Sequence, residues 1–331
     1  MKAPRVTLAV SVLTLVIALL IGMAIGSDSI PLRYVFDTSD QKLHDALVVA
    51  RLPRVILAAL SGAGLSVAGV ALQATLRNPL AEPYVLGVSG GCALGATLAI
   101  VLGLAPFSYL GASLVPLAAL AGGAVATAIV YALVRRWGTG DSYAVILSGF
   151  ALNAIASSVI TLVRTLASPV IGQKVSFYLT GSLDSQGWPA LAFVALYVCL
   201  GFGMLMRDGG RLNLLALGDE GATHLGVNVK KLERRTFLAG SLIVGAIVSM
   251  TGMIGFVGLL VPHAMRKLLG PDVRLLLPTS FFFGGAALVL CDAASRLMYQ
   301  WLHRELAVGA VTALIGGPLF LALMVRRPSP A

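Results

Sequence analysis

Charged residues are scarce in this sequence. Aspartate, glutamate, lysine and arginine make up 11% of its 331 residues, whereas 58% are hydrophobic and the mean hydropathy is +0.92. Soluble domains carry about 25% charged residues, so this composition excludes an ordinary soluble domain and predicts an integral membrane protein. The net charge of +10 does not indicate a nucleic-acid partner, because the basic residues lie between apolar runs and not on one face of a soluble fold.

Residues that carry metal, redox or nucleotide chemistry are also few. Cys92, Cys199 and Cys291 lie far apart in apolar runs without metal-ligand or redox spacing, so we interpret them as core residues. The four histidines are scattered and predict no metal site. No Gly-rich loop followed by Lys-Ser or Lys-Thr occurs, so the chain cannot bind nucleotide phosphates in the Walker manner. We therefore expect no catalytic residue and no cofactor in this chain.

Long apolar runs dominate what is present. A membrane-spanning helix needs roughly 17–25 apolar residues. The first run is too long for the apolar core of a signal peptide, so we interpret it as a retained helix. We predict an all-α polytopic membrane protein, a single transmembrane domain over residues 1–331 with about ten helices. The predicted spans are 6–25, 55–75, 84–104, 113–134, 143–166, 189–206, 236–253, 255–268, 275–295 and 306–325.

The basic residues set the expected orientation. With both termini in the cytoplasm, the inner side receives most lysines and arginines, including every tight basic pair except Arg51 and Arg54. The positive-inside rule favours this topology. It makes 207–235 the one long cytoplasmic segment and places 27–54 and 167–188 outside.

A polar stretch, RNPLAEP at 77–83, interrupts the apolar sequence. Pro79 and Pro83 lack an amide donor and disfavour helix at the preceding residue. We expect a short non-helical turn in which Asn78 and Glu82 pair with freed backbone groups. Such backbone is tolerated in a membrane only where protein or a water-filled path surrounds it. An ordinary inter-helix loop is the alternative interpretation.

The sequence around this turn resembles a known family. The stretch RLPRVILAALSGAGLSVAGVALQATLRNPLAEPYVLGVSGG at 51–91 is similar to the signature region of the iron-chelate and cobalamin permeases. These are the membrane subunits of type II ABC importers. Further stretches agree in the expected order, namely LALGDEGATHLGV at 215–227, GFVGLLVPHAMRKLLGPDVRLLLP at 255–278, DAASR, and ELAVGAVTALIGGPLF at 305–320.

The resemblance implies a fold, a function and partners. The fold is the ten-helix type II ABC importer permease, which works as a homodimer with the pathway at the dimer interface. The function is import of a bulky metal chelate (haem, ferric siderophore or cobalamin) across the bacterial inner membrane. Two cytoplasmic ATPase subunits, which carry ATP and Mg, and a periplasmic substrate-binding protein are the implied partners, with membrane lipid around the chain.

Three arginines lie where the charge rule does not expect them. Arg51, Arg54 and Arg296 fall outside in this topology. One interpretation is arginines at helix ends, with Asp292 one turn before Arg296 as a partner. The resemblance implies instead a basic rim that docks glutamates of the substrate-binding protein, and we favour this interpretation.

The segment 212–235 predicts two short helices. Asn213 caps the first and Gly218 ends it, Asp219 or Glu220 favours the start of the second, and Gly226 ends that one. The apolar residues expected to be exposed are Leu214, Leu215, Leu217, Ala222 and Leu225. A simple connector does not need so much exposed leucine. The resemblance implies that this knob fits a cleft on the ATPase and couples its closure to the helices.

One predicted helix carries a polar stripe. Asn153, Ser157, Thr161 and Arg164 share a helical face by their spacing. Interhelical hydrogen bonding is one explanation, and the wall of a wet pathway is the other. The resemblance implies that this fifth helix lines the pathway.

The resemblance also implies a cytoplasmic gate. Asn78 and Leu80, with Asp141 and Ser142 before the fifth helix, occupy the gate positions. Asp141 departs from the cobalamin permease pattern, which has small hydroxyl residues there.

Two other functions are compatible with parts of the sequence. A secondary transporter or channel usually shows a deep acid or ion pair, and the deep candidate here, Asp292, has Arg296 beside it. An intramembrane serine protease would use Ser89 in the short GVSG match, with His263 from another apolar segment as the base.

Overall fold

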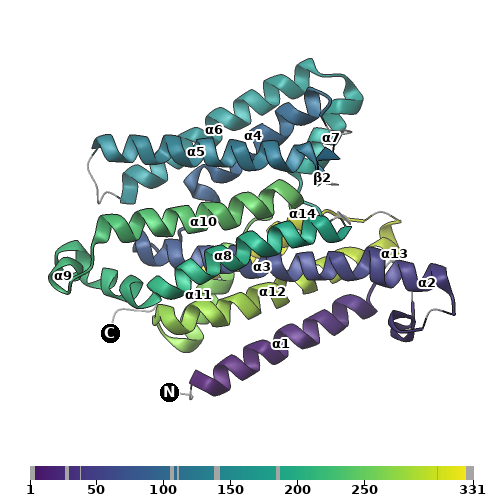
Figure 1. The fold of residues 1–331 in the computed structure, drawn as a ribbon, viewed down its shortest axis with the longest axis horizontal. Coiled ribbons are helices and arrows are strands. Elements are labelled where there is room, and N and C mark those ends of the chain that lie inside the picture. The colour runs from purple at the N-terminus through teal and green to yellow at the C-terminus, as the bar shows by residue number, and fades with distance from the viewer. Residues whose placement is uncertain are drawn as a thin grey trace.

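The computed structural model describes residues 4–26, 30–37, 39–104, 108–109, 112–137, 142–183, 187–303 and 305–325. Over these residues the chain is a bundle of helices (Figure 1). The elements are α1 (Pro4–Ala24), η1 (Leu32–Val35), α2 (Gln41–Asp45), η2 (Ala46–Arg51), α3 (Leu52–Thr75), η3 (Pro83–Leu86), α4 (Val88–Val101), β1 (Ser108–Tyr109), β2 (Ala112–Ser113), α5 (Leu114–Trp137), α6 (Ser142–Leu166), α7 (Pro169–Leu179), α8 (Gly187–Leu214), η4 (Leu215–Leu217), α9 (Gly218–His224), α10 (Val229–Thr251), α11 (Val257–Leu269), α12 (Val273–Leu297), α13 (Tyr299–Leu302) and α14 (Val308–Val325).

The predicted all-α architecture is confirmed, apart from the short antiparallel pair β1–β2. Each predicted span falls on a helix. Among the described residues, six helical stretches are long and apolar enough to cross a membrane, and the helices at Val88–Val101 and Val308–Ala322 are shorter apolar ones. The seventh and eighth predicted spans are separated at 252–256, where α10 has ended and α11 has not begun.

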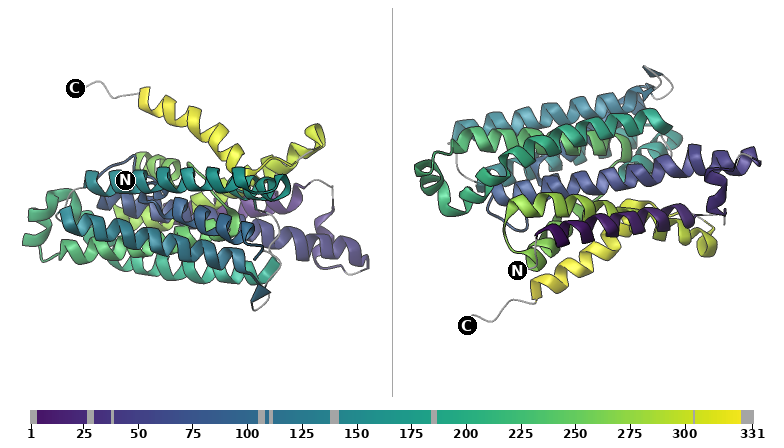
Figure 2. Two further views of the ribbon diagram at one scale, coloured as in Figure 1. Left: turned by 90° about the horizontal axis from the view of Figure 1, so that it is seen from above. Right: turned by 60° about the horizontal axis from the view of Figure 1, so that its bottom comes forward.

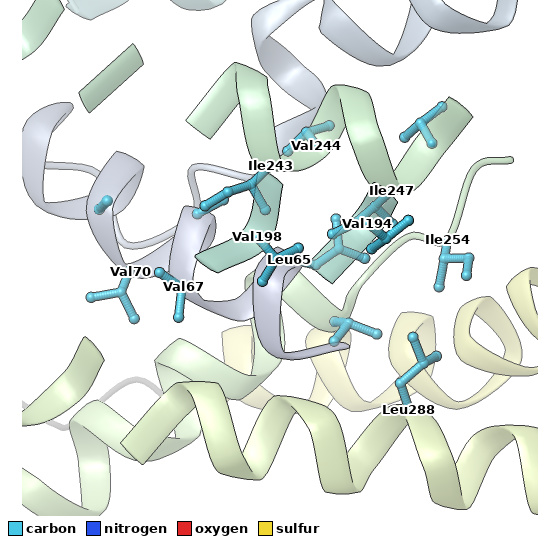
Figure 3. Close-up of a cluster of buried hydrophobic side chains, with 14 of the residues drawn as sticks. Leu65, Val67, Val70, Val194, Val198, Ile243, Val244, Ile247, Ile254 and Leu288 are labelled. Carbon is cyan, nitrogen blue, oxygen red and sulfur yellow. The ribbon is translucent and has the colours of Figure 1, made fainter. Parts of the chain in front are cut away.

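Helix α3 runs through the middle of the bundle (Figure 1). Within the helical stretch that contains it, Gln41–Thr75, 89% of the residues in an apolar 18-residue part are buried, whereas the corresponding share for the peripheral α1 is 22%. An apolar helix surrounded by protein on all sides is typical of such a central position. Its side chains meet α8, α10 and α12 in one core, in which Leu65, Val198, Ile247 and Leu288 are fully or almost fully buried (Figure 3).

Small residues allow the central helices to touch through their backbones. A Cβ atom built on Gly62 of α3 would overlap the carbonyl oxygen of Gly284 in α12. In the same way, a Cβ atom on Gly69 would overlap the carbonyl oxygen of Gly258 in α11. The small residues of the SGAGLSVAG sequence therefore let α3 pack closely against its neighbours, as is common between helices in lipid.

The bundle has two distinct ends. Helix α9 projects from one end, where α1 also begins, and α2 projects from the opposite end (Figures 1 and 2). We call these the α9 end and the α2 end. Helix α14 stands away from the other helices in Figure 2 and leaves Leu314, Leu319 and Leu321 exposed.

Candidate functional site

The polar turn, residues 77–83, follows the C-terminus of α3. The amide of Asn78 donates to the carbonyl of Gln73 at 3.2 Å, and the amide of Arg77 donates to the carbonyl of Ala74 at 3.4 Å. These two hydrogen bonds form a Schellman motif, which ends α3. The side-chain oxygen of Asn78 then accepts the amide of Leu80 at 2.9 Å. The predicted non-helical turn, with Asn78 pairing to freed backbone, is confirmed.

The far end of the polar turn is attached to the break between α10 and α11. Glu82 Oε1 accepts the amide of Phe256 at 2.8 Å, and the hydroxyl of Tyr84 accepts the amide of Ile254 at 2.9 Å. Phe256 has a φ of 67°, a conformation that takes its backbone out of the helix. Two non-helical segments from distant parts of the chain thus satisfy each other's polar groups, as backbone within a membrane protein must.

Asn153 joins α6 to this same region. Its amide nitrogen donates to the carbonyl of Tyr84 at 2.9 Å, and its oxygen accepts the amide of Gly90 at 3.1 Å. This member of the predicted polar stripe therefore binds other helical segments, which matches the interhelical interpretation of its role.

The other members of the stripe are exposed. Ser157 and Thr161 lie on the surface of α6, where the Thr161 hydroxyl donates to the carbonyl of Ser157 at 2.8 Å. Arg164 donates to the hydroxyl of Ser176 in α7 at 3.1 Å. Their place in a pathway stays a prediction.

The structure describes three of the four predicted gate residues. Leu80 is 37% exposed and Asn78 is half-buried. Ser142 is the first residue of α6. Asp141 lies outside the described residues. The assignment of these four positions to a gate stays a prediction.

The predicted knob is built differently from the expectation. Helix α8 continues without interruption to Leu214, so the expected separate first helix is wrong. The side chain of Asn213 caps α12 instead, accepting the amide of Val273 at 2.8 Å and donating to Asp272 at 2.7 Å. The helix stays intact across Gly209 and Gly210 because these small residues let α8 lie against Arg274 and Leu277 of α12.

The apolar residues of the knob divide into two sets. Leu215 and Ala222 are fully buried, so their expected exposure is wrong, and Leu214 is half-buried. Leu217 and Leu225 are 63% and 58% exposed and form what we call the leucine surface. The buried residues anchor η4 and α9 on the bundle, which leaves the leucine surface free to contact a partner.

Glycines bound α9 as predicted. Gly218 and Gly226 have φ values of 88° and 81°, in the region that glycine adopts without strain. Asp219 and Glu220 occupy the first turn, where acidic residues are favourable.

An ion pair that sequence reasoning missed connects α9 to the polar turn. Arg77 binds Asp219 through its guanidinium, and the two side chains are 39% and 40% exposed. In the sequence, Arg77 is one of the basic residues that the predicted topology places inside, and its pattern predicts no partner for it. Nothing in the sequence pairs two charges that lie 142 positions apart.

The predicted docking arginines converge at the α2 end. Arg54 Nε donates to Asp292 Oδ1 at 3.0 Å and Arg54 Nη1 to Glu305 at 2.9 Å. Arg296 lies 2.9 Å from Asp292 Oδ2. We call Arg51, Arg54, Arg296 and Asp292 the arginine cluster. The i,i+4 partnership of Asp292 and Arg296 is confirmed, and Arg54 joins it from α3.

Two of these arginines do not form an exposed basic rim. Arg51 is 9% and Arg296 3% exposed, so the expectation that both present open charges is wrong. Arg51 donates to the carbonyl of Met23 at 3.0 Å, and Arg296 donates to those of Ile25 and Gly22 at 2.6 and 2.9 Å. The last carbonyls of α1 have no partner within their own helix, and guanidinium groups satisfy them here.

The protease interpretation gains no geometric support. Ser89 is buried, and its hydroxyl donates to the carbonyl of Tyr84 at 3.3 Å. No hydrogen bond between Ser89 and His263 is found among the described residues. That part of the chain also contains no group of three or more His, Cys, Asp or Glu side chains able to hold a metal ion.

A cavity of about 510 Å³ lies between α4, α5, α7 and α10. Apolar side chains form most of its wall, and Gln173 and Lys174 of α7 add polar groups. This cavity lies near the α7 segment that Arg164 contacts.

The arrangement of helices is shared with a solved structure. A metal-chelate type ABC transporter in an inward-facing conformation has 31% sequence identity to this chain and a TM-score of 0.87, covering 98% of this chain and 100% of that one. The fold is that of a type II ABC importer permease. The sequence matches the FecCD transport family over residues 14–326, and the chain belongs to that family. It is a transport permease and not an enzyme.

Curated relatives have similar lengths. The hemin transport system permease protein HmuU of Yersinia pestis is 35% identical over 98% of this chain and 96% of its own length. The cobalamin import system permease protein BtuC of Halobacterium salinarum is 38% identical over 84% of this chain and 72% of its own length.

Proposed function

We propose that this chain is the membrane subunit of an ABC importer that moves a bulky metal chelate from a periplasmic binding protein into the cytoplasm. The observation that carries the proposal is the leucine surface at the two ends of α9. Leu217, the last residue of η4, and Leu225, the residue after α9, are 63% and 58% exposed, and the buried Leu215 and Ala222 anchor this segment, which suits a contact with another protein. A cytoplasmic ATPase is the partner that an importer of this family needs, since this chain has no Walker motif.

The orientation follows from that partner. The α9 end faces the cytoplasm in the bacterial inner membrane, and the α2 end faces the periplasm. The basic residues support this, since Lys230, Lys231, Arg234 and Arg235 lie beside α9 and cytoplasmic loops carry an excess of positive charge. Both termini are then cytoplasmic.

A second copy of the chain completes the pathway. Helix α6 exposes Phe150, Ile155 and Leu162 next to the polar Ser157 and Thr161. Helix α14 likewise exposes Leu314, Leu319 and Leu321, although its first turns are buried. A homodimer that joins these helices would give the pathway a wall with apolar and polar residues, and lipid would cover the remaining apolar surface.

The binding protein docks at the α2 end in this proposal. Arg54 is the member of the arginine cluster that supports direct docking, because its side chain is 13% exposed and already pairs with the half-exposed Glu305. Arg51 and Arg296 are buried and support docking indirectly, because they hold the end of α1 in place. Acidic groups on the partner could exchange with Glu305, and contacts of this kind mainly set register and association rate.

The cargo is an anionic chelate, either haem or a ferric siderophore, in preference to cobalamin. Arg164 and Lys174 provide positive charge near the α2 end, and Lys174 borders the cavity beside α7. The relative named for hemin transport is consistent with this choice.

Reconstitution tests the proposal. We expect haemin or a ferric siderophore to enter proteoliposomes only when the chain is combined with its ATPase, its binding protein and ATP with Mg. Uptake by the purified chain alone against a gradient, driven by protons or sodium, would instead identify a secondary transporter.

A further inference from the structure

Arg77 has a backbone conformation that favours glycine. Its φ is 48°, and it occupies the position after α3 at which a Schellman motif usually places glycine. Any side chain at this position adds strain to the folded chain. We therefore expect a contact of the arginine side chain to offset this strain. The ion pair with Asp219 of α9 is such a contact.

The polar turn is braced so that a displacement of Arg77 reaches the whole turn. The buried Gln73 donates to the carbonyl of Ala81 at 3.3 Å, and the amide of Ala81 donates to the carbonyl of Asn78 at 3.0 Å. With the bond between Asn78 and Leu80, these contacts hold residues 78–81 as one unit. Glu82 then fixes the end of the turn to the start of α11 through Phe256.

Asp219 lies in the segment that carries the leucine surface, so a protein that binds there also acts on Asp219. It lies two residues after Leu217 and six before Leu225, the leucines of the leucine surface. Glu233, at the cytoplasmic start of α10, interacts with both residues of the pair. Burial raises the pKa of Glu233, Asp219 raises it further, and Arg77 lowers it. Charged residues of α9, α10 and the polar turn therefore interact with one another in this region.

We propose that the Arg77–Asp219 ion pair is the strut that transmits movement of α9 to the polar turn, and thereby to Asn78 and Leu80. The two residues are positioning residues, since neither contacts cargo or nucleotide. The inference rests on the proposed function, in which an ATPase binds α9. An exposed ion pair contributes little to stability, so its loss should affect the movement and leave the fold intact.

The test measures the gate distance in the assembled importer. A spin label is attached at Leu80→Cys in a chain whose native cysteines are replaced by alanine, and the distance between the two copies is measured by pulsed electron paramagnetic resonance. The complex with its ATPase is compared without nucleotide and after trapping with ATP, Mg and vanadate. In the otherwise unchanged chain we expect the distance distribution to shift on trapping.

Arg77→Gly is the most informative variant. Glycine suits the positive φ, so the melting temperature should equal or exceed that of the unchanged chain, while the nucleotide-dependent shift should be lost. Asp219→Asn should also lose the shift, and Asp219→Glu should keep it. The exchanged pair Arg77→Asp with Asp219→Arg should recover it, whereas Lys267→Glu, an exposed charge at the end of α11, serves as the control that leaves it unchanged.

The outcomes separate the two proposals. A full shift in Arg77→Gly or Asp219→Asn, or no shift in the unchanged complex, would overturn the strut. Failure of the unchanged chain to bind the ATPase at all would overturn the proposed function, and the strut with it.

Discussion

Arg54 of α3 and Asp292 of α12 form a hydrogen-bonded ion pair, with 3.0 Å between Nε and Oδ1, across 238 positions of sequence. Asp292 is fully buried and also faces Arg296. One carboxylate thus balances two guanidinium groups, one of which caps the last carbonyls of α1. The α2 end of three helices is held together at this point.

Removing the carboxylate should destabilise the fold strongly. Asp292→Ala leaves the buried Arg296 without its counter-charge and leaves Arg54 with Glu305 alone, and breaking a buried ion pair from one side costs about 3–5 kcal/mol. We expect a large fall in the melting temperature in detergent. The control is Glu305→Gln, which loses only the half-exposed partner of Arg54 and should cost at most about 1 kcal/mol. Equal melting of the two variants would contradict the structural role of Asp292.

The contact between Glu82 and Phe256 should depend on an acceptor and not on charge. Glu82→Ala leaves the amide of Phe256 without its partner, which costs about 1–3 kcal/mol for a buried group. Glu82→Gln retains a carbonyl oxygen and should melt close to the unchanged chain. Comparison of the two melting curves checks this, and equal losses in both variants would indicate that the negative charge itself is required.

The ten predicted spans were recognisable as apolar runs, and the end of α3 was predictable from Pro79 and Pro83. The continuation of α8 through Gly209 and Gly210 was not. Those glycines resemble a break in sequence, but they lie against Arg274 and Leu277 of α12. A local pattern does not contain that contact.

The arginine cluster shows a second limit. The predicted topology puts Arg51 and Arg296 outside, and the resemblance implies that they face a partner. In the structure both donate to backbone carbonyls, those of Gly22, Met23 and Ile25. Every helix ends in unpaired carbonyls, so the sequence cannot say which arginine will find them.

Close packing at Gly62 should not tolerate a side chain. Gly62→Val forces α3 and α12 apart, since a Cβ atom there overlaps the carbonyl of Gly284, and overpacking of this kind costs about 1–3 kcal/mol or more. The matched control is Gly203→Ala in α8, where nothing lies within 4 Å of the added atom. We expect the control to melt at or above the temperature of the unchanged chain. A stable Gly62→Val would mean that the two helices separate freely.

The leucine surface should determine ATPase binding. Leu217→Asp with Leu225→Asp places charge on a surface that the ATPase must desolvate, so co-purification of the ATPase should fall at least tenfold, which corresponds to about 1.4 kcal/mol. The control is Phe36→Asp, an apolar residue at the α2 end that is even more exposed, at 93%, and this variant should bind the ATPase normally. Normal binding by the double variant would remove α9 from the interface.

Docking of the binding protein should respond to Glu305. The Glu305 carboxylate lies 2.9 Å from Arg54 Nη1 in the isolated chain, so an acidic group on the partner must compete with Glu305 for Arg54. Glu305→Gln removes the competitor and leaves the buried pair with Asp292 intact, and an exposed pair of this kind is worth about 0–1 kcal/mol. We expect up to about fivefold tighter binding at low salt, with the gain vanishing at high salt because surface charges are screened. Weaker docking of Glu305→Gln would show instead that the partner binds Glu305 itself, and Arg54 would then serve to orient that carboxylate.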